Sequence, residues 1–74
     1  MPASIPAVPG AKVVKALEQA GFSVERIRGS HHVMRHPDGR TVTVPVHSGD
    51  MPKGTLRNIL AIVSMTADDL RHLI

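Results

Sequence analysis

The sequence predicts one α+β domain with the element order α-β-β-β-α-α, in which helices cover one face of a three-stranded antiparallel sheet. Apolar residues recur at helical spacing in two segments, at residues 11–20 and 56–63. Between them, three short segments of strand character are separated by turn signals at residues 29–30 and 36–39. A chain of 74 residues can bury only one apolar core, so all these elements must share it.

The first helix is expected over residues 11–20, and Gly21 supplies the left-handed residue that ends it. Its apolar positions predict one buried stripe, formed by Val13, Val14, Ala16, Leu17 and Ala20. Residues 1–9 contain three prolines, which withhold backbone donors. We therefore expect a flexible Pro-rich tail at 1–9, ahead of a single domain at 10–74.

Two strands are expected next, at residues 22–28 and 31–36, joined by a turn at 29–30. Val24 and Ile27 are available for burial on the first of them, but a spacing of three breaks the alternation of a regular strand. We therefore expect a bulge or a strand end between these two residues.

The third strand is the clearest in the chain and covers residues 40–46, after a strong turn signal at 36–39. Valines alternate with threonines along this strand, which predicts one buried side formed by Val42, Val44 and Val46. Pro45 lacks a backbone donor, so this strand either lies at an edge of the sheet or ends its pairing there.

A loop at 47–54 precedes the second helix, whose apolar stripe is formed by Leu56, Ile59, Leu60 and Val63. Thr66 is expected to cap a short third helix, with Asp69 at the reciprocal capping position. Met65 can then pack against Leu70. Helices on one face leave the other face of the sheet uncovered, and function can be placed there.

Charge and composition narrow the possible partners. Nine Lys and Arg against six Asp and Glu give a formal charge of +3 and a pI near 10.2, which favours a polyanionic partner. The chain has no cysteine, so no disulfide framework is available and a cytoplasmic location is expected. No apolar run approaches the roughly 20 residues that span a bilayer, and the N-terminus lacks a signal-peptide pattern, so no membrane partner is expected.

Histidine is the outstanding residue type, because four of the five histidines lie between residues 31 and 47. His31 and His32 are adjacent in a strand, so their side chains point to opposite sides and one of them should be exposed. Val33 shares a side with His31 and Met34 shares a side with His32, so alternation leaves open which histidine faces the core. An exposed imidazole titrates near neutral pH and can act as an acid or a base.

Two other chemistries find less support. The histidines at 31, 32, 36 and 47 match no familiar metal-ligand spacing, so we expect no metal and no cofactor. A nucleophilic Ser30 would need a base and an orienting carboxylate, and the sequence contains no G-x-S-x-G turn.

Basic residues form two groups that a phosphate backbone could bridge. The first group lies on the first hairpin, near His31, and comprises Arg26, Arg28 and Arg35. The second group is Lys53 and Arg57, at the start of the second helix. Unpaired backbone donors and the positive end of the helix dipole favour a phosphate at that position.

Four motifs resemble the HicA toxin family, and they occur in the same order. They are Gly29-Ser30-His31-His32, the HPDG sequence at 36–39, Val44-Pro45 with His47, and Lys53-Gly54-Thr55-Leu56. The likeness runs from about Val13 to Leu70, whereas the Pro-rich start before Gly10 is outside the family pattern. It implies a fold similar to double-stranded RNA-binding domains, cleavage of mRNA as the toxin of a toxin-antitoxin system, and neutralisation by a HicB-type antitoxin that covers the active site.

The resemblance also implies that His31, the first histidine after the Gly-Ser pair, is the catalytic residue of a metal-independent endoribonuclease. Neutral His31 would take the proton of a ribose 2′-OH, which then attacks the adjacent phosphorus in line, and such assistance is typically worth about 10² to 10⁴ in rate. His32 or His47 is a candidate acid, and Lys53 or a hairpin arginine is a candidate stabiliser of phosphate charge. The candidate RNA-binding residues are Arg26, Arg28, Ser30, Arg35, Lys53 and Arg57.

Two non-catalytic interpretations stay open. A double-stranded RNA-binding module would share the fold and the basic charge, but it needs no titratable group after the Gly-Ser turn. A protein-interaction partner would use the uncovered sheet and would bind no RNA even at low salt.

Overall fold

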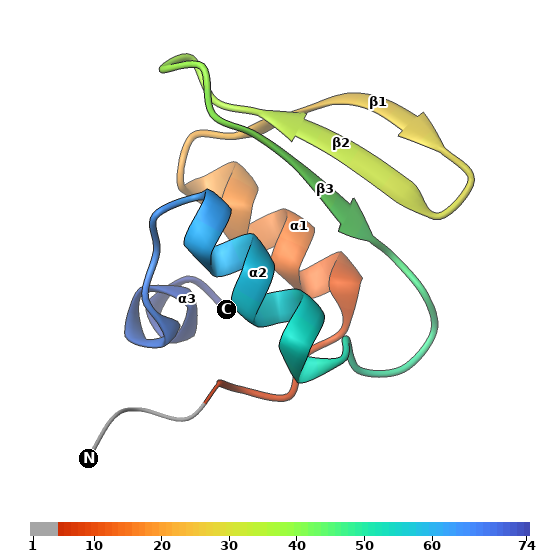
Figure 1. The fold of residues 1–74 in the computed structure, drawn as a ribbon, viewed down its shortest axis with the longest axis vertical. Coiled ribbons are helices and arrows are strands. Elements are labelled where there is room, and N and C mark those ends of the chain that lie inside the picture. Colours follow the sequence, from red (N-terminus) through yellow and green to blue (C-terminus); the bar gives the residue numbers. More distant parts are fainter. Residues whose placement is uncertain (1–4) are drawn as a thin grey trace.

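A computed structural model of the protein describes residues 5–74 and contains three helices and three strands in that range (Figure 1). In chain order they are α1 (Gly10–Gln19), β1 (Ser23–Arg28), β2 (His31–Arg35), β3 (Thr41–Pro45), α2 (Lys53–Ile62) and α3 (Ala67–Leu73). This order confirms the predicted α-β-β-β-α-α topology and an α+β fold consistent with double-stranded RNA-binding domains.

The strands form one antiparallel sheet in the order β1-β2-β3, with α1 and α2 on one side of it (Figure 1). Residues paired across the strands fall into rows that alternate between the two faces. The helix-facing rows consist of Val24, Met34 and Val42, followed by Ile27, His32 and Val44. β3 is an edge strand, which explains how Pro45 is accommodated at its end.

The two long helices are amphipathic, and each buries its apolar stripe against the sheet. α1 contributes Val13, Ala16 and Leu17 to the core, and α2 contributes Leu56, Ile59 and Leu60. α1 ends as predicted, because Gly21 has φ +103° and the next amide, that of Phe22, donates to the Leu17 carbonyl at 2.9 Å.

α3 begins with the predicted capping box. The Asp69 amide donates to the Thr66 hydroxyl at 3.0 Å, and the Thr66 amide donates to the Asp69 carboxylate at 2.9 Å. Leu70 is fully buried and Met65 is partly buried against the same core, so the cap fixes α3 where its one buried side chain is needed.

β1 contains the expected irregularity, since its register with β2 shifts between Val24 and Arg26. Glu25 is the extra residue of this bulge, which lets Val24 and Ile27 both lie on the helix side. Burial of Ile27 was nevertheless a wrong prediction, because its side chain is 57% exposed. The turn end of the β1-β2 hairpin extends past α1, so no helix covers this residue (Figure 1).

The N-terminal segment takes part in the packing. Residues 1–4 of the expected tail lie outside the described residues, but Val8 is only 5% exposed and belongs to the core. Its carbonyl accepts the Met51 amide at 2.8 Å, and Pro9 forms a β-bridge with Asp50. The core thus begins before Gly10, because flanking prolines hold the segment extended and present Val8 to it.

Within residues 5–74, the helices have at most ten residues, and none is both long and apolar enough to cross a bilayer.

Candidate functional site

His31 is the first residue of β2 and follows the two-residue turn at Gly29 and Ser30. Gly29 has φ +57°, a left-handed conformation that other residues rarely adopt, so glycine is favoured at this reversal. The Ser30 carbonyl accepts the Val46 amide at 2.7 Å, which ties the turn to the chain that leaves β3. The turn therefore holds His31 at a fixed place on the rim of the sheet.

The face of the sheet opposite the helices is called the open face here. It is formed by nine residues in three rows: Arg28, His31 and Pro45; Arg26, Val33 and Thr43; Ser23, Arg35 and Thr41. His31 is exposed on this face and shares it with the half-buried Val33, whereas Met34 is fully buried on the other. The register thus settles which of the two adjacent histidines points away from the core.

Three arginines share the open face with His31, and all of them are exposed. Arg28 lies directly opposite His31 on β1, a position where side chains stand about 5 Å apart, and Arg26 lies in the next row. Arg35 lies four residues along β2, about 13 Å away at the strand rise, and its Nη1 is 4.0 Å from Oε1 of Glu25 in the bulge. The hairpin cations are therefore concentrated around His31, with one acidic side chain beside the farthest of them.

His32 lies on the helix side, in the same row as Ile27 and Val44. Its Nδ1 is buried and has no hydrogen-bond partner among the described residues. The sheet separates His32 from His31, so the suggestion that His32 serves as the acid for a group bound at His31 was wrong. His47 is exposed two residues beyond Pro45, which is the β3 partner of His31, and it stays a candidate.

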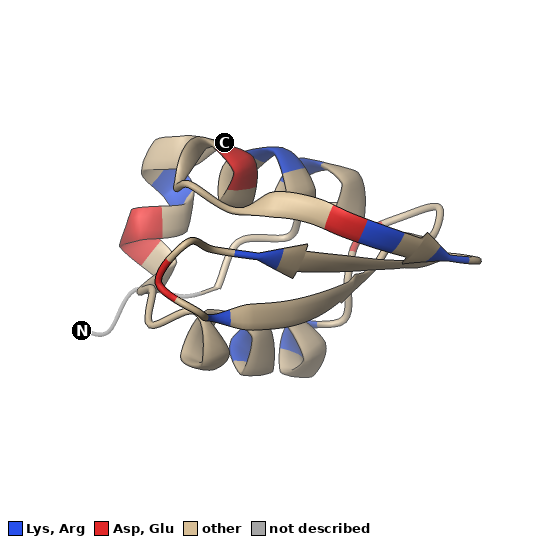
Figure 2. Ribbon diagram, turned by 90° about the horizontal axis from the view of Figure 1, so that it is seen from above, with Lys and Arg blue, Asp and Glu red and all other residues tan. Residues whose placement is uncertain are grey.

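The second basic group lies elsewhere. Lys53 and Arg57 are exposed on the first turns of α2, in the helical layer, while the opposite side of that helix packs on the sheet. The first turn of α2 has no side-chain cap and no acidic residue. Figure 2 shows Lys and Arg positions on the strands and, separately, on the helices. The structure therefore does not bring this group onto the open face with the hairpin arginines.

The HPDG turn has a structural role. The Asp38 amide donates to Nδ1 of His36 at 3.1 Å, and the His36 ring packs edge-on against Phe22 at 5.0 Å. Arg40 donates to the Asp38 carboxylate at 2.8 Å, lies over the Phe22 ring and donates to the Val63 carbonyl at the end of α2. The Arg40 backbone amide, which donates to Asp38, lowers the pKa of that carboxyl. Sequence reasoning missed Arg40, although a basic residue directly after a turn can reach back to its acidic residue.

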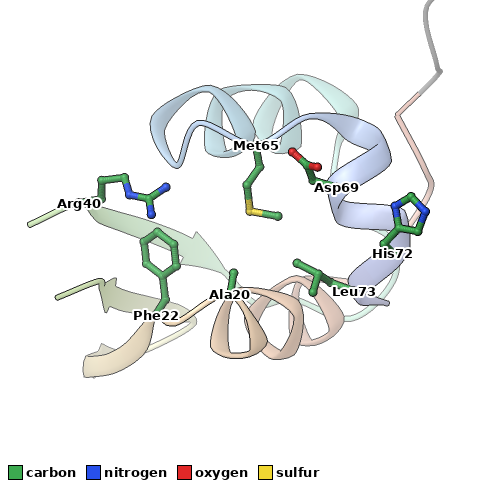
Figure 3. A pocket seen from close by; sticks show the side chains of 7 residues that line it. All are labelled: Ala20, Phe22, Arg40, Met65, Asp69, His72 and Leu73. Carbon is green, nitrogen blue, oxygen red and sulfur yellow. The ribbon is translucent and has the colours of Figure 1, made fainter. Parts of the chain in front are cut away.

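A hollow of about 360 Å³ lies between the end of α1, the Arg40 side chain and α3. Figure 3 shows that Phe22, Met65 and Leu73 line it together with the charged Arg40 and Asp69. None of its lining residues belongs to the open face, so it is separate from the site around His31. Residues 5–74 contain no cluster of three or more His, Cys, Asp or Glu side chains placed to hold a metal ion.

Comparison with known proteins identifies the family of the chain. A comparison with curated proteins gives no match. The family model described as the HicA toxin of bacterial toxin-antitoxin matches residues 10–64, a range that includes every motif quoted above and the whole open face. The chain therefore belongs to the HicA toxin family of bacterial toxin-antitoxin systems.

Proposed function

We propose that this HicA toxin is a metal-independent endoribonuclease that cleaves mRNA in the cytoplasm, with His31 as the catalytic base. The observation that carries the proposal is the position of His31, exposed on the open face beside Arg28 and anchored by a rigid turn. A fixed, accessible imidazole next to a cation is what the attack of a ribose hydroxyl on its own phosphate requires.

The reaction follows from these groups. Neutral His31 removes the proton of a 2′-OH, and the oxygen attacks the neighbouring phosphorus and closes a 2′,3′-cyclic phosphate. Arg28, opposite His31, stabilises the negative charge that builds on the phosphate oxygens. The 5′-oxygen leaves with a proton, and His47 is the proposed donor because it lies on the chain that follows the strand beside His31. The nucleophile is part of the substrate, so no metal-bound water is needed.

RNA binding is assigned to the hairpin and to α2. Arg26, Arg28 and Arg35 contact phosphates on the open face, and Ser30 lies in the turn next to the base. Lys53 and Arg57 are in the helical layer, so they contact RNA that passes round the end of the molecule.

The decisive experiment compares the wild-type chain with His31→Gln and with His72→Gln as the matched control. His72 is exposed on α3, outside the family match, and its substitution should leave cleavage unchanged. His31→Gln should reduce cleavage of a labelled RNA in EDTA by about 10² to 10⁴ and should abolish growth arrest on induced expression. Equal cleavage by two folded variants would remove His31 from catalysis and favour the non-catalytic RNA-binding module.

The substrate supplies two further checks of the mechanism. An RNA whose 2′-OH groups are replaced by hydrogen should resist cleavage completely, because the nucleophile is missing. A sulfur in place of the bridging 5′-oxygen leaves without a proton, so His47→Gln should cleave that RNA at the wild-type rate and natural RNA more slowly. Slow cleavage of both substrates would assign His47 a role other than the acid.

A HicB-type antitoxin is the proposed protein partner, and it neutralises the toxin by covering the open face. Mixing the purified partners should stop cleavage at one antitoxin per toxin. Arg28→Glu should weaken the complex, because the substitution reverses the charge beside His31.

A further inference from the structure

The open face has a composition suited to phosphates and poorly suited to bases. Three of its nine positions are arginine, three carry a hydroxyl group, and the remaining three are His31, Val33 and Pro45. None of the nine is Phe, Tyr or Trp, and none is Asn or Gln. Phe22, the one Phe, Tyr or Trp residue of the chain, is 3% exposed and belongs to the core.

Proteins that read RNA sequence commonly use large aromatic rings and amide side chains, which this face lacks. They stack unpaired bases on aromatic rings and hydrogen-bond the edges of these bases with side chains that match them. Arginines and hydroxyl groups most often contact the charged phosphates, which are the same at every nucleotide. Such contacts hold the strand and fix its direction, but they carry no information about its bases.

We propose that this toxin selects unpaired RNA by its phosphates on Arg26, Arg28 and Arg35, and that its cleavage is independent of base identity. This inference rests on the proposed function. Because Arg28 lies opposite His31 and Arg26 lies in the next row, the phosphate that reacts and the one next to it are the two that these side chains hold. Arg35 holds a phosphate farther along β2.

The chemistry explains the preference for unpaired RNA. In-line attack requires the 2′-oxygen to stand opposite the leaving 5′-oxygen, an arrangement that a continuous base-paired helix does not reach. The enzyme would have to open a duplex first, and the open face offers no Phe, Tyr or Trp side chain to insert between bases. The active chain therefore acts on unpaired segments, although its fold is similar to double-stranded RNA-binding domains.

The salt dependence of RNA binding gives a quantitative test of these phosphate contacts. Each phosphate neutralised on single-stranded RNA contributes about −0.7 to the slope of log K against log salt concentration. Arg26→Ala, Arg28→Ala and Arg35→Ala should each make the slope shallower by about 0.7, and by the same amount on every RNA sequence. Lys15→Ala is the control, since Lys15 is exposed on α1 on the other side of the sheet, and its slope should equal that of the parent.

Binding is measured by fluorescence anisotropy with the full-length His31→Gln protein and labelled 12-nucleotide RNAs of A, of U, of C and of mixed sequence. We expect dissociation constants within about threefold of one another at each salt concentration. Binding of one sequence more than tenfold tighter than the rest would overturn the inference, as would an arginine substitution that alters the slope for one sequence alone.

Cleavage is then mapped with the wild-type protein on the mixed RNA, alone and annealed to its complement. Cuts after all four bases in the free strand, with the duplex intact, are the expected result. Cuts after a single base, or equal cleavage of the duplex, would overturn this inference and leave the proposed function in place. Absence of cleavage in both RNAs would instead overturn the proposed function, and the inference with it.

Discussion

Gly10 packs closely against the strand beside the candidate site, and this packing makes a testable prediction for Gly10→Ala. Gly10 is the first residue of α1 and is buried. A Cβ at this position would lie 2.4 Å from the Pro45 carbonyl oxygen and 3.0 Å from the Val46 Cα, and both atoms are backbone. Pro45 is the β3 partner of His31, so the added methyl group must push α1 away from the strand that supports the site.

The size of the effect follows from two opposing contributions. Forcing an extra methyl group into a packed region costs about 1 to 3 kcal/mol. Replacing glycine in a helix by alanine returns about 0.5 to 1 kcal/mol through chain entropy. The free energy of unfolding should therefore fall, by up to about 2.5 kcal/mol, which lowers Tm by up to roughly 20 °C in a domain of this size.

Gly54→Ala is the matched control, because it makes the same substitution in the other long helix. A Cβ at Gly54 meets no atom within 4 Å, so only the entropic gain applies. Its Tm should rise by about 2 to 8 °C. Thermal melts followed by circular dichroism at 222 nm measure both variants, and two shifts of the same sign would refute the reasoning.

Three further predictions concern the turn and the caps. Arg40→Met should lower the free energy of unfolding by about 1 to 3 kcal/mol in urea titrations, since it removes hydrogen bonds to Asp38 and to the end of α2, and Arg40→Lys should not restore the loss. Thr66→Ala should cost about 1 kcal/mol, whereas Thr66→Ser should keep the cap. Backbone hydrogen bonds, from Arg40 to Asp38 and from Thr66 to Asp69, lower the pKa of both carboxyls in the folded state. The two ionised carboxyls therefore stabilise the fold fully at a pH above their ordinary pKa of 3.8. This stabilisation is lost as the pH falls through the lower pKa values of the folded state. In thermal melts from pH 7 to 2, Tm should fall at acid pH, and the fall should be smaller in Asp69→Ala.

Much of the fold follows from chemistry that is local in the sequence. Alternating valines defined β3, and the Thr66 cap with Asp69 marked the start of α3, because the partners are within three residues of each other. Contacts between distant segments were not accessible in this way. Val8 packs beside Met51, and Arg40 reaches the end of α2, 23 residues farther along the chain.

The candidate site was predicted in its components and not in its arrangement. The sequence placed basic residues near His31 and at the start of α2, but spacing along a chain does not reveal which layer of the fold each group occupies. The structure assigns the hairpin arginines to the open face and assigns Lys53 and Arg57 to the helical layer. The orientation of His31 required the register of three strands, because alternation alone has two equivalent solutions.

The bulge at Glu25 connects the core of this fold to its surface chemistry. In a regular strand Val24, Arg26 and Arg28 would share one face, so burying the valine would also bury both arginines. One extra residue reverses the alternation after Val24, which then faces the helices while Arg26 and Arg28 stand beside His31 on the open face. The cationic environment of His31 therefore depends on this single inserted position, and it is the bulge that allows one short strand to serve both the core and the site.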